Sequence, residues 1–200
     1  VGRMGMTSAE QTISYVWWNL GSKIPGSTII SATGSLYQYE AESCSTSKAT
    51  NVYQVTSTWT EGATVYTSRP DINGTAVSSW TRNVGGAGCS TSNDRVTFDL
   101  KSLVQKWANG TANYGVSLKA PPASATDLSF GKRFCSSDYA SSDDACFTAD
   151  RIPKLSVTFS SAPSVPSGPT FVQTGSAAGV TNVAKPVLTA LSREINETIH

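Results

Sequence analysis

Short runs in which apolar residues alternate with Ser, Thr or Asn recur along the first 160 residues of the chain. Examples are ISYVWWNL at 13–20, NVYQVTSTW at 51–59 and KLSVTFS at 154–160. An alternation with a period of two places the apolar side chains on one face of a β-strand, where they can be buried. Many short strands separated by turns predict an all-β fold, an antiparallel β-sandwich or a jelly roll.

The longest predicted strand lies within residues 27–41 and directs four residues inward: Ile30, Ala32, Gly34 and Leu36. Gly34 has no side chain, so it either leaves a gap at a core-facing position or marks a β-bulge. Another strand is expected at 63–70. Residues 71–93 are predicted to be loop-like, with VGGAG as a flexible loop inside them.

One segment departs from the strand pattern and has the spacing of a helix. Apolar residues recur there at intervals of three and four, namely Leu100, Leu103, Val104, Trp107 and Ala108. This spacing predicts a short amphipathic helix near 100–108, with Asp99 as its N-cap and Asn109-Gly110 at its end. A helix of ~9 residues does not persist alone in water, so we expect it to cap an open end of the sandwich.

Four cysteines, Cys44, Cys89, Cys135 and Cys146, occur in a chain whose only histidine is His200. A Cys/His zinc site is therefore not expected. An even number of cysteines in a lightly charged, Ser/Thr-rich chain favours disulfides and an oxidising compartment. Of the three pairings that four cysteines allow, we favour Cys135–Cys146, which closes a short polar loop, and then Cys44–Cys89; buried free thiols are the alternative.

Composition excludes several classes of partner. Charged residues make up only 14% of the chain and the net charge is +1, so nucleic acid is not an expected partner. No stretch approaches the ~20 consecutive apolar residues that a membrane-spanning helix needs. The balance is typical of an extracellular, β-rich module.

The pattern changes after residue 160. SAPSVPSGP at 161–169 is predicted to be an extended Pro/Ser linker. Residues 170–200 are interpreted as the truncated start of a second β domain, so the chain is expected to be a piece of a longer protein.

Several segments within 1–160 are together similar to the DNRLRE domain, a family related to family 96 carbohydrate-binding modules. FDLKSLVQKWANGTANYGVSLKA at 98–120 resembles its short helix and following strand, and TSTWTEGATVYTSRP at 56–70 resembles its Trp-x-Glu signature. IPGSTIISATGSLYQY at 24–39 resembles a strand of the family, and RIPKLSVTFS at 151–160 resembles its closing strand.

The resemblance implies a jelly-roll-like module without catalytic residues, in secreted multidomain bacterial surface proteins. Some relatives bind acidic polysaccharide, and others precede YD/Rhs-type repeat shells. Three departures from the family pattern are visible. An opening strand of the DTYV kind is missing before Val1 and is either absent or donated by another chain, Gly34 stands where Leu is usual, and Trp17 stands where Arg or Lys is common.

Catalytic and metal-binding arrangements find little support in the sequence. Glu40 and Glu42 share a strand face, as glycosidase carboxylates could, but a solvated strand end is strongly favoured. Glu61 is interpreted as a turn anchor or as a partner of Arg69. Acidic residues near the last two cysteines could hold structural calcium, although a solvated loop is favoured; they are Asp138, Asp143, Asp144 and Asp150. We therefore predict no enzyme activity and no required cofactor.

Aromatic residues give the candidate binding site. By alternation Tyr15 and Trp17 share the outward face of one strand, and Tyr37 and Tyr39 share that of a possible neighbour. If those strands pair, four rings form a flat patch on which sugar rings can stack. Cover by protein is the alternative. Trp18 by alternation, and Trp59 and Trp107 by the family framework, are predicted core residues; Trp80 has no assigned role.

Two functions remain open at this point. The first is a non-catalytic, secreted or cell-surface module that binds extracellular polysaccharide or adheres through its aromatic face. The second is a purely structural module of a surface fibre or repeat toxin shell, in which the same face contacts neighbouring domains or protomers. The sequence flanking this segment would discriminate between them.

Overall fold

The computed structural model describes residues 2–7, 10–45, 48–61, 64, 68–86, 89–121, 127–137, 146, 149–160 and 194–199. Its strands are β1 Gly2–Thr7, β2 Glu10–Thr12, β3 Ser14–Val16, β4 Thr28–Ala41, β5 Thr50–Val55, β6 Ile72–Trp80, β7 Asp94–Asp99, β8 Val116–Lys119, β9 Lys132–Phe134, β10 Lys154–Ser160 and β11 Glu194–Ile199. The α-helix α1 spans Lys101–Ala108, and short 3₁₀ turns span Leu128–Phe130 and Ala149–Arg151.

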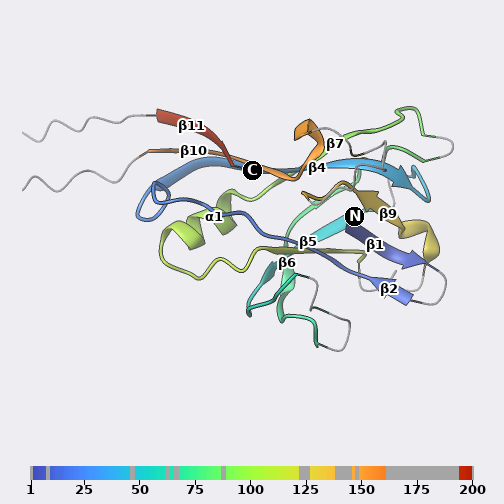
Figure 1. The fold of residues 1–200 in the computed structure, drawn as a ribbon, viewed down its shortest axis with the longest axis horizontal. Helices are drawn as coiled ribbons and strands as arrows, with labels where there is room; N and C mark the ends of the chain where they lie inside the picture. The colour runs from blue at the N-terminus through green and yellow to red at the C-terminus, as the bar shows by residue number, and fades with distance from the viewer. Residues whose placement is uncertain are drawn as a thin grey trace, which may run out of the picture.

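Within the described residues these strands form two antiparallel sheets. The seven-stranded sheet has the order β11-β10-β4-β9-β1-β2, with β7 also pairing with β4, and the four-stranded sheet has the order β3-β8-β5-β6. In Figure 1, β4 and β10 run across the upper part of the molecule, with β5 and β6 below them. Both sheets contribute buried side chains to one apolar cluster, among them Leu36, Val157, Val52 and Leu118. The fold is therefore the all-β sandwich that the sequence predicts.

Strand β10 shows why the alternation is informative. Its residues alternate between half-buried and buried along KLSVTFS, with Leu155, Val157 and Phe159 in the core. The segment pairs with β4 on one side and with β11 on the other. A strand with one face buried has its register fixed by that face, so the pattern can be read directly.

Strand β4 corrects one prediction at its start. Ile30 is 41% exposed, whereas Ile29 is 2% exposed and lies in the core. The register to β10 shifts between the pairs Thr158–Ser31 and Phe159–Ile29, so Ile30 has no partner in the ladder. This β-bulge adds one residue and reverses the inward side of the strand, which the alternation alone could not reveal.

Gly34 leaves no gap in the core. Its neighbour in register on β7 is Phe98, and a Cβ placed on Gly34 would lie 2.4 Å from that ring. The ring of Phe98 also stacks on Trp80 with centroids 5.1 Å apart. Phe98 therefore occupies the volume that a leucine side chain at position 34 would take.

The prediction of a loop at 71–93 is wrong for its first part. Residues 72–80 form β6, which pairs with β5 and ends at Trp80, a core residue. Residues 81–86 are outside the strands, as a loop there requires, and Gly85 and Gly86 lie against the backbone of β4. Strand β6 is an edge strand in which every residue except Trp80 is exposed or half-buried, and such strands lack a clear apolar signal.

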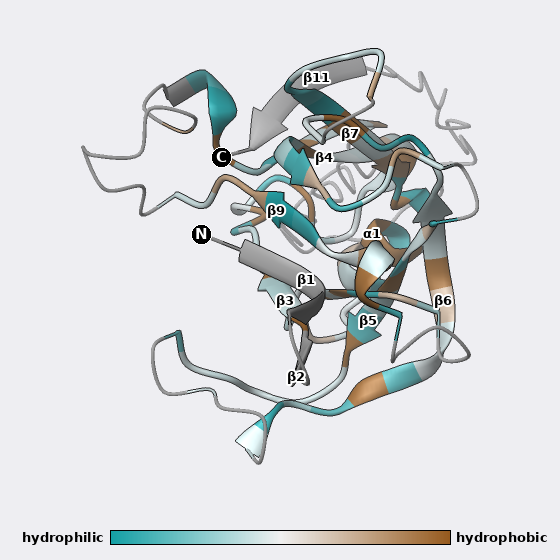
Figure 2. Ribbon diagram, turned by 90° about the vertical axis from the view of Figure 1, so that its right-hand side faces the viewer, coloured by the Kyte–Doolittle hydropathy of each residue, from teal (hydrophilic) through white to brown (hydrophobic). Residues whose placement is uncertain are grey.

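Helix α1 confirms the predicted short helix, with Leu103, Val104, Trp107 and Ala108 buried. It lies beneath β4 in Figure 1 and has both brown and teal stretches in Figure 2. The N-cap is Leu100 rather than Asp99, although the Asp99 carboxylate accepts a hydrogen bond from the Lys101 amide at 2.9 Å. Gly110, with a φ of 99°, follows the helix end in the left-handed conformation expected there.

The cysteines pair as predicted. The Cα atoms of Cys44 and Cys89 lie 5.3 Å apart, and those of Cys135 and Cys146 lie 5.4 Å apart. Both separations fall in the range of roughly 4.4–6.8 Å that disulfides adopt.

Half of the predicted strand at 63–70 lies outside the described residues, and its described residues, 64 and 68–70, are not in a strand. The linker at 161–169 and residues 170–193 lie wholly outside the described residues. The predicted boundary between two domains, and the predicted absence of an opening strand, therefore stay predictions. Strand β11 pairs with β10 in the sheet of the module, and β1 lies between β9 and β2.

Candidate functional site

A groove with a volume of about 560 Å³ opens where the edge of the smaller sheet approaches the larger one. That volume falls in the range of roughly 300–1,000 Å³ typical of small-molecule sites. Its apolar part is formed by core residues: Leu36, Leu118 and Phe134 of the two sheets, and Trp18, which follows β3. Aromatic residues at its surface are Tyr15, Trp17, Trp59 and Tyr114, and polar residues include Thr58, Glu61, Asn113, Ser136 and Ser137.

The exposed rings belong to segments that are distant in sequence. Trp17 follows β3 and is 52% exposed. Trp59 follows β5, and its ring lies 5.6 Å from that of Tyr15 at an interplanar angle of 40°. Burial raises the pKa of the Tyr15 hydroxyl, and the positive charge of Arg69 partly opposes this rise. The Tyr15 hydroxyl is therefore neutral at physiological pH and can donate a hydrogen bond.

The segment Asn113–Gly115 holds both tryptophans in place. The indole N–H of Trp17 donates to the carbonyl of Asn113 at 3.1 Å, and that of Trp59 donates to the carbonyl of Tyr114 at 2.8 Å. Two consecutive backbone carbonyls therefore orient the two indoles. When a ligand stacks on rings that are already fixed, less side-chain entropy is lost on binding.

Asn113 and Gly115 in turn fix this segment against β3. The side-chain Nδ2 of Asn113 donates to the carbonyl of Trp18 at 2.8 Å, and its side-chain Oδ1 accepts from the backbone amide of Gly115 at 3.0 Å. Gly115 has a φ of 83°, and a Cβ there would lie 2.2 Å from the carbonyl oxygen of Val16. Only glycine fits this close approach without moving the backbone next to Trp17.

The four aromatic residues predicted as one patch lie on two sheets. Tyr15 and Trp17 both line the groove. Tyr37 and Tyr39 lie on β4, which does not pair with β3, because β3 belongs to the smaller sheet. The guanidinium of Arg151 lies over the Tyr37 ring, 4.6 Å from the ring centroid. A single flat surface of four rings is therefore not formed, and a ligand contact by Tyr37 and Tyr39 stays a prediction.

Trp59 is the site residue that the sequence pattern did not reveal. The family framework predicts it in the core, but it is only partly buried and lines the groove beside Tyr15. The sequence STW, with polar neighbours continuing after β5, is a signal that the strand has ended. Trp18 and Trp107 are core residues as predicted.

Two of the acidic residues considered for catalysis or metal binding have other partners. Glu40 accepts a hydrogen bond from Arg133 at 2.6 Å, and Asp150 accepts one from Lys154 at 3.0 Å. Asp138, Asp143 and Asp144 lie outside the described residues. In the described part of the chain, no group of three or more His, Cys, Asp or Glu residues could hold a metal ion.

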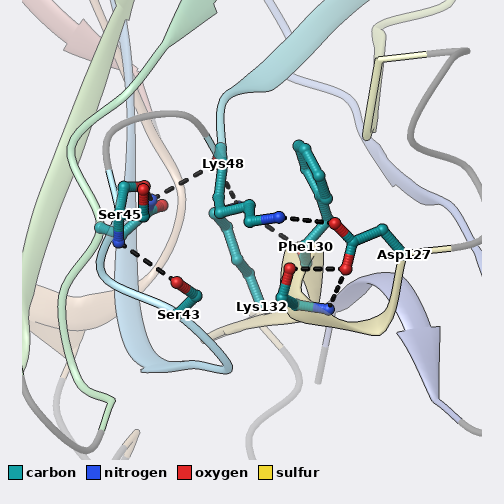
Figure 3. Close-up of polar contacts among 8 residues, drawn as sticks. Ser43, Ser45, Lys48, Asp127, Phe130 and Lys132 are labelled. Atoms are coloured by element: carbon teal, nitrogen blue, oxygen red, sulfur yellow. Dashed lines mark hydrogen bonds and ion pairs between the residues drawn. The ribbon is translucent and has the colours of Figure 1, made fainter.

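A second polar cluster surrounds Lys132, which is 2% exposed (Figure 3). The Lys132 ammonium donates to the carbonyls of Lys48 at 2.8 Å and Phe130 at 3.3 Å. The Lys48 ammonium binds the Asp127 carboxylate at 2.5 Å and lies 4.6 Å from the centre of the Phe130 ring. Hydrogen bonds from Lys48 and Ser129 lower the pKa of Asp127 to about 2. Burial, together with the charge of Lys48, lowers the pKa of Lys132 to about 8.

This cluster predicts that the protein becomes more stable at mildly alkaline pH. The pKa of Lys132 is about 8 in the folded protein, below the value of 10.5 that is ordinary for a lysine in water. Between these values the unfolded chain binds more protons, so the free energy of unfolding should rise with pH, by at most ~3 kcal/mol. Urea unfolding at pH 7.5, 8.5, 9.5 and 10 measures this slope.

The variant Lys132→Met isolates the contribution of this one group. It keeps an unbranched apolar stem and removes the titrating amine, so its slope over the same pH range should be smaller than that of the wild type. Equal slopes in the two proteins would show that Lys132 does not titrate in this window.

A comparison of the sequence with protein-family models identifies the family. The model of carbohydrate-binding module family 96 matches residues 3–141 of the chain. The chain belongs to this family. A family 96 module binds carbohydrate and is not catalytic, which agrees with the prediction that the chain is not an enzyme. The matched residues include every aromatic residue of the groove.

A comparison with curated proteins found no match. The narrower resemblance to the DNRLRE domain stays a prediction. Among the described residues of this family 96 module, no helix is long and apolar enough to cross a bilayer.

Proposed function

We propose that this module binds an extracellular polysaccharide in the groove, with sugar rings stacked on Trp17 and held beside Tyr15 and Trp59. The observation that carries the proposal is the pair of indoles whose N–H groups are fixed by the consecutive carbonyls of residues 113 and 114. The apolar C–H faces of sugars stack on such rings. The hydroxyl groups of Thr58 and Ser137 also line the groove and can pair with sugar hydroxyls.

We further propose that the module is part of a larger secreted or cell-surface bacterial protein. Two disulfides support an oxidising compartment, where such bonds persist. The linker at 161–169 and a second domain after it, as predicted from sequence, would then connect the binding module to the rest of that protein.

The variant Trp17→Ala tests the groove. Affinity electrophoresis in gels that contain alginate, pectin or cell-wall polymers should show retardation of the wild type by at least one polymer. Trp17→Ala should weaken this binding by about tenfold or more, because one central aromatic contact commonly contributes ~2 kcal/mol. Ile30→Ala is the control, since Ile30 is 41% exposed but lies on the larger sheet outside the groove lining.

Two results would contradict the proposal. If no polymer retards the wild type, the alternative of a structural module in a fibre or toxin shell gains support. If a polymer retards the wild type and Trp17→Ala equally, the ligand binds elsewhere on the molecule.

A further inference from the structure

The groove lining has a second part that flanks the Cys135–Cys146 disulfide. Cys135, Ser136 and Ser137 follow β9, and Ile152 and Pro153 precede β10. These two segments are the two ends of one connection, residues 135–153, which joins β9 to β10. Their position against the groove therefore depends on where this connection leaves the larger sheet and where it returns to it.

The connection between β9 and β10 leaves the larger sheet and returns to it beside nearly the same residues of β4. Strand β9 ends opposite Gln38, and the amide of Cys135 then donates to the carbonyl of Tyr37 at 3.0 Å. Strand β10 begins opposite Ser35. Since β7 pairs with residues 33–38 of β4, strands β9 and β10 share the remaining edge of β4 and meet there.

Arg95 reaches this meeting point from the far edge of β4. It lies on β7 opposite Tyr37, and its guanidinium donates to the hydroxyl of Ser35 at 3.1 Å. The same guanidinium donates to the carbonyl of Ile152 at 2.9 Å and to that of Asp150. One side chain therefore connects β7, β4 and the segment that returns to β10.

Two more contacts hold residues 150–152 of the segment that returns to β10. The guanidinium of Arg151 lies over the ring of Tyr37, and Lys154 forms an ion pair with Asp150. Tyr37 thus supports the returning segment on the outer face of the larger sheet, a role different from the ligand contact predicted from sequence. Of these contacts, only those of Arg95 hold the backbone itself, through two of its carbonyls.

We propose that Arg95 is a positioning residue of the carbohydrate site, which sets the place of Ile152 and Pro153 in the groove lining without touching the ligand. The inference rests on the proposed function of the groove. A planar guanidinium can donate to several acceptors in a fixed fork, whereas a lysine ammonium acts as a single flexible point charge. Lysine at position 95 keeps the charge but cannot hold the Ser35 hydroxyl and both carbonyls in the same geometry.

The experiment compares Arg95→Met and Arg95→Lys with wild type and with the control Arg133→Met. Arg133 also carries a partly exposed guanidinium on the larger sheet, but it pairs with Glu40 and not with the returning segment. Two quantities are measured well below the unfolding temperature: the affinity for the polymer that retards wild type, and the hydrogen exchange of peptides covering 149–154.

Both Arg95 variants should bind the polymer about tenfold more weakly, since a hydrogen bond to a charged group contributes on the order of one such factor. Exchange in 149–154 should be faster in both, because the segment opens more often once its backbone carbonyls are released. Arg133→Met should match wild type in both measurements. Arg95→Lys serves as the milder change if Arg95→Met unfolds.

Several outcomes would overturn the inference. Wild-type affinity in Arg95→Lys would show that the fork does not shape the site. Reduced affinity with unchanged exchange would show that Arg95 acts by another route. If Trp17→Ala binds as wild type, the proposed function of the groove fails, and the exchange measurement alone then decides whether Arg95 holds the segment.

Discussion

Replacing Gly85 with alanine is expected to lower the free energy of unfolding by ~3–5 kcal/mol, a large part of the roughly 5–15 kcal/mol that stabilises most domains. Gly85 has a φ of 82°, which costs a residue with a Cβ about 1–2 kcal/mol. The new Cβ would also lie 2.3 Å from both the carbonyl carbon and the oxygen of Tyr39. Because Tyr39 belongs to β4, the central strand of the larger sheet, its backbone cannot yield without disturbing the sheet.

Two other glycines separate the two causes of this effect. Gly110 has a φ of 99° with nothing within 4 Å of the place that a Cβ would take, so Gly110→Ala should show only the conformational cost of ~1–2 kcal/mol. Gly74 on β6 also has open space around it and no positive φ, so Gly74→Ala should be neutral or stabilise by ~0.5 kcal/mol. Thermal and urea unfolding of the three variants give the order directly. If Gly85→Ala were no worse than Gly110→Ala, the packing of the 84–86 segment against β4 would be looser than these distances indicate.

Replacing Leu103 with alanine is expected to cost ~2–5 kcal/mol. Leu103 is 1% exposed and belongs to the apolar cluster between the sheets, beside Val104 and Trp107 of the same helix. Truncation removes buried methyl groups and leaves a cavity that the rigid strands above the helix can fill only in part. Urea unfolding with an unchanged dependence on denaturant concentration would show that the loss is one of stability alone.

Leu128→Ala is the matched control for this change. It removes the same atoms from a side chain that is 48% exposed on a short 3₁₀ turn. Its cost should stay below ~1 kcal/mol, as for most surface substitutions. If Leu103→Ala lowered the free energy of unfolding by as little as Leu128→Ala, α1 would not close the sandwich and would be only loosely attached to it.

The parts of the fold that could be predicted from sequence are those in which one face of an element is buried. Apolar residues recur with a period of two in strands β7 and β10 and at intervals of three and four in helix α1. The positions of these elements and their inward-facing residues can therefore be read from the sequence. The register shift at Ile30 was not visible, because a bulge depends on what the partner strand does. Strand β6 gives no such signal, because all its residues except Trp80 are exposed or half-buried, as loop residues are.

The candidate site was only half predictable. Tyr15 and Trp17 could be identified because they are large and face outward near a strand end. Trp59 could not, because its place beside Tyr15 depends on the pairing of β8 with both β3 and β5. The contributions of Ser136, Ile152 and Arg95 depend on contacts between residues far apart in the chain, and no local pattern records such contacts.

The meeting of β9 and β10 at one point of β4 has a consequence for how this module can diversify. The stretch between Cys135 and Cys146 is tied at both ends, with Cα atoms 5.4 Å apart, so its length is not constrained by any span that it must bridge. Each doubling of a closed loop costs only about 0.6 kcal/mol. Insertions at this place, next to the groove residues Ser136 and Ser137, should therefore leave the hydrogen bonding of both sheets intact. If the groove binds carbohydrate as proposed, such insertions would change which ligand it accepts.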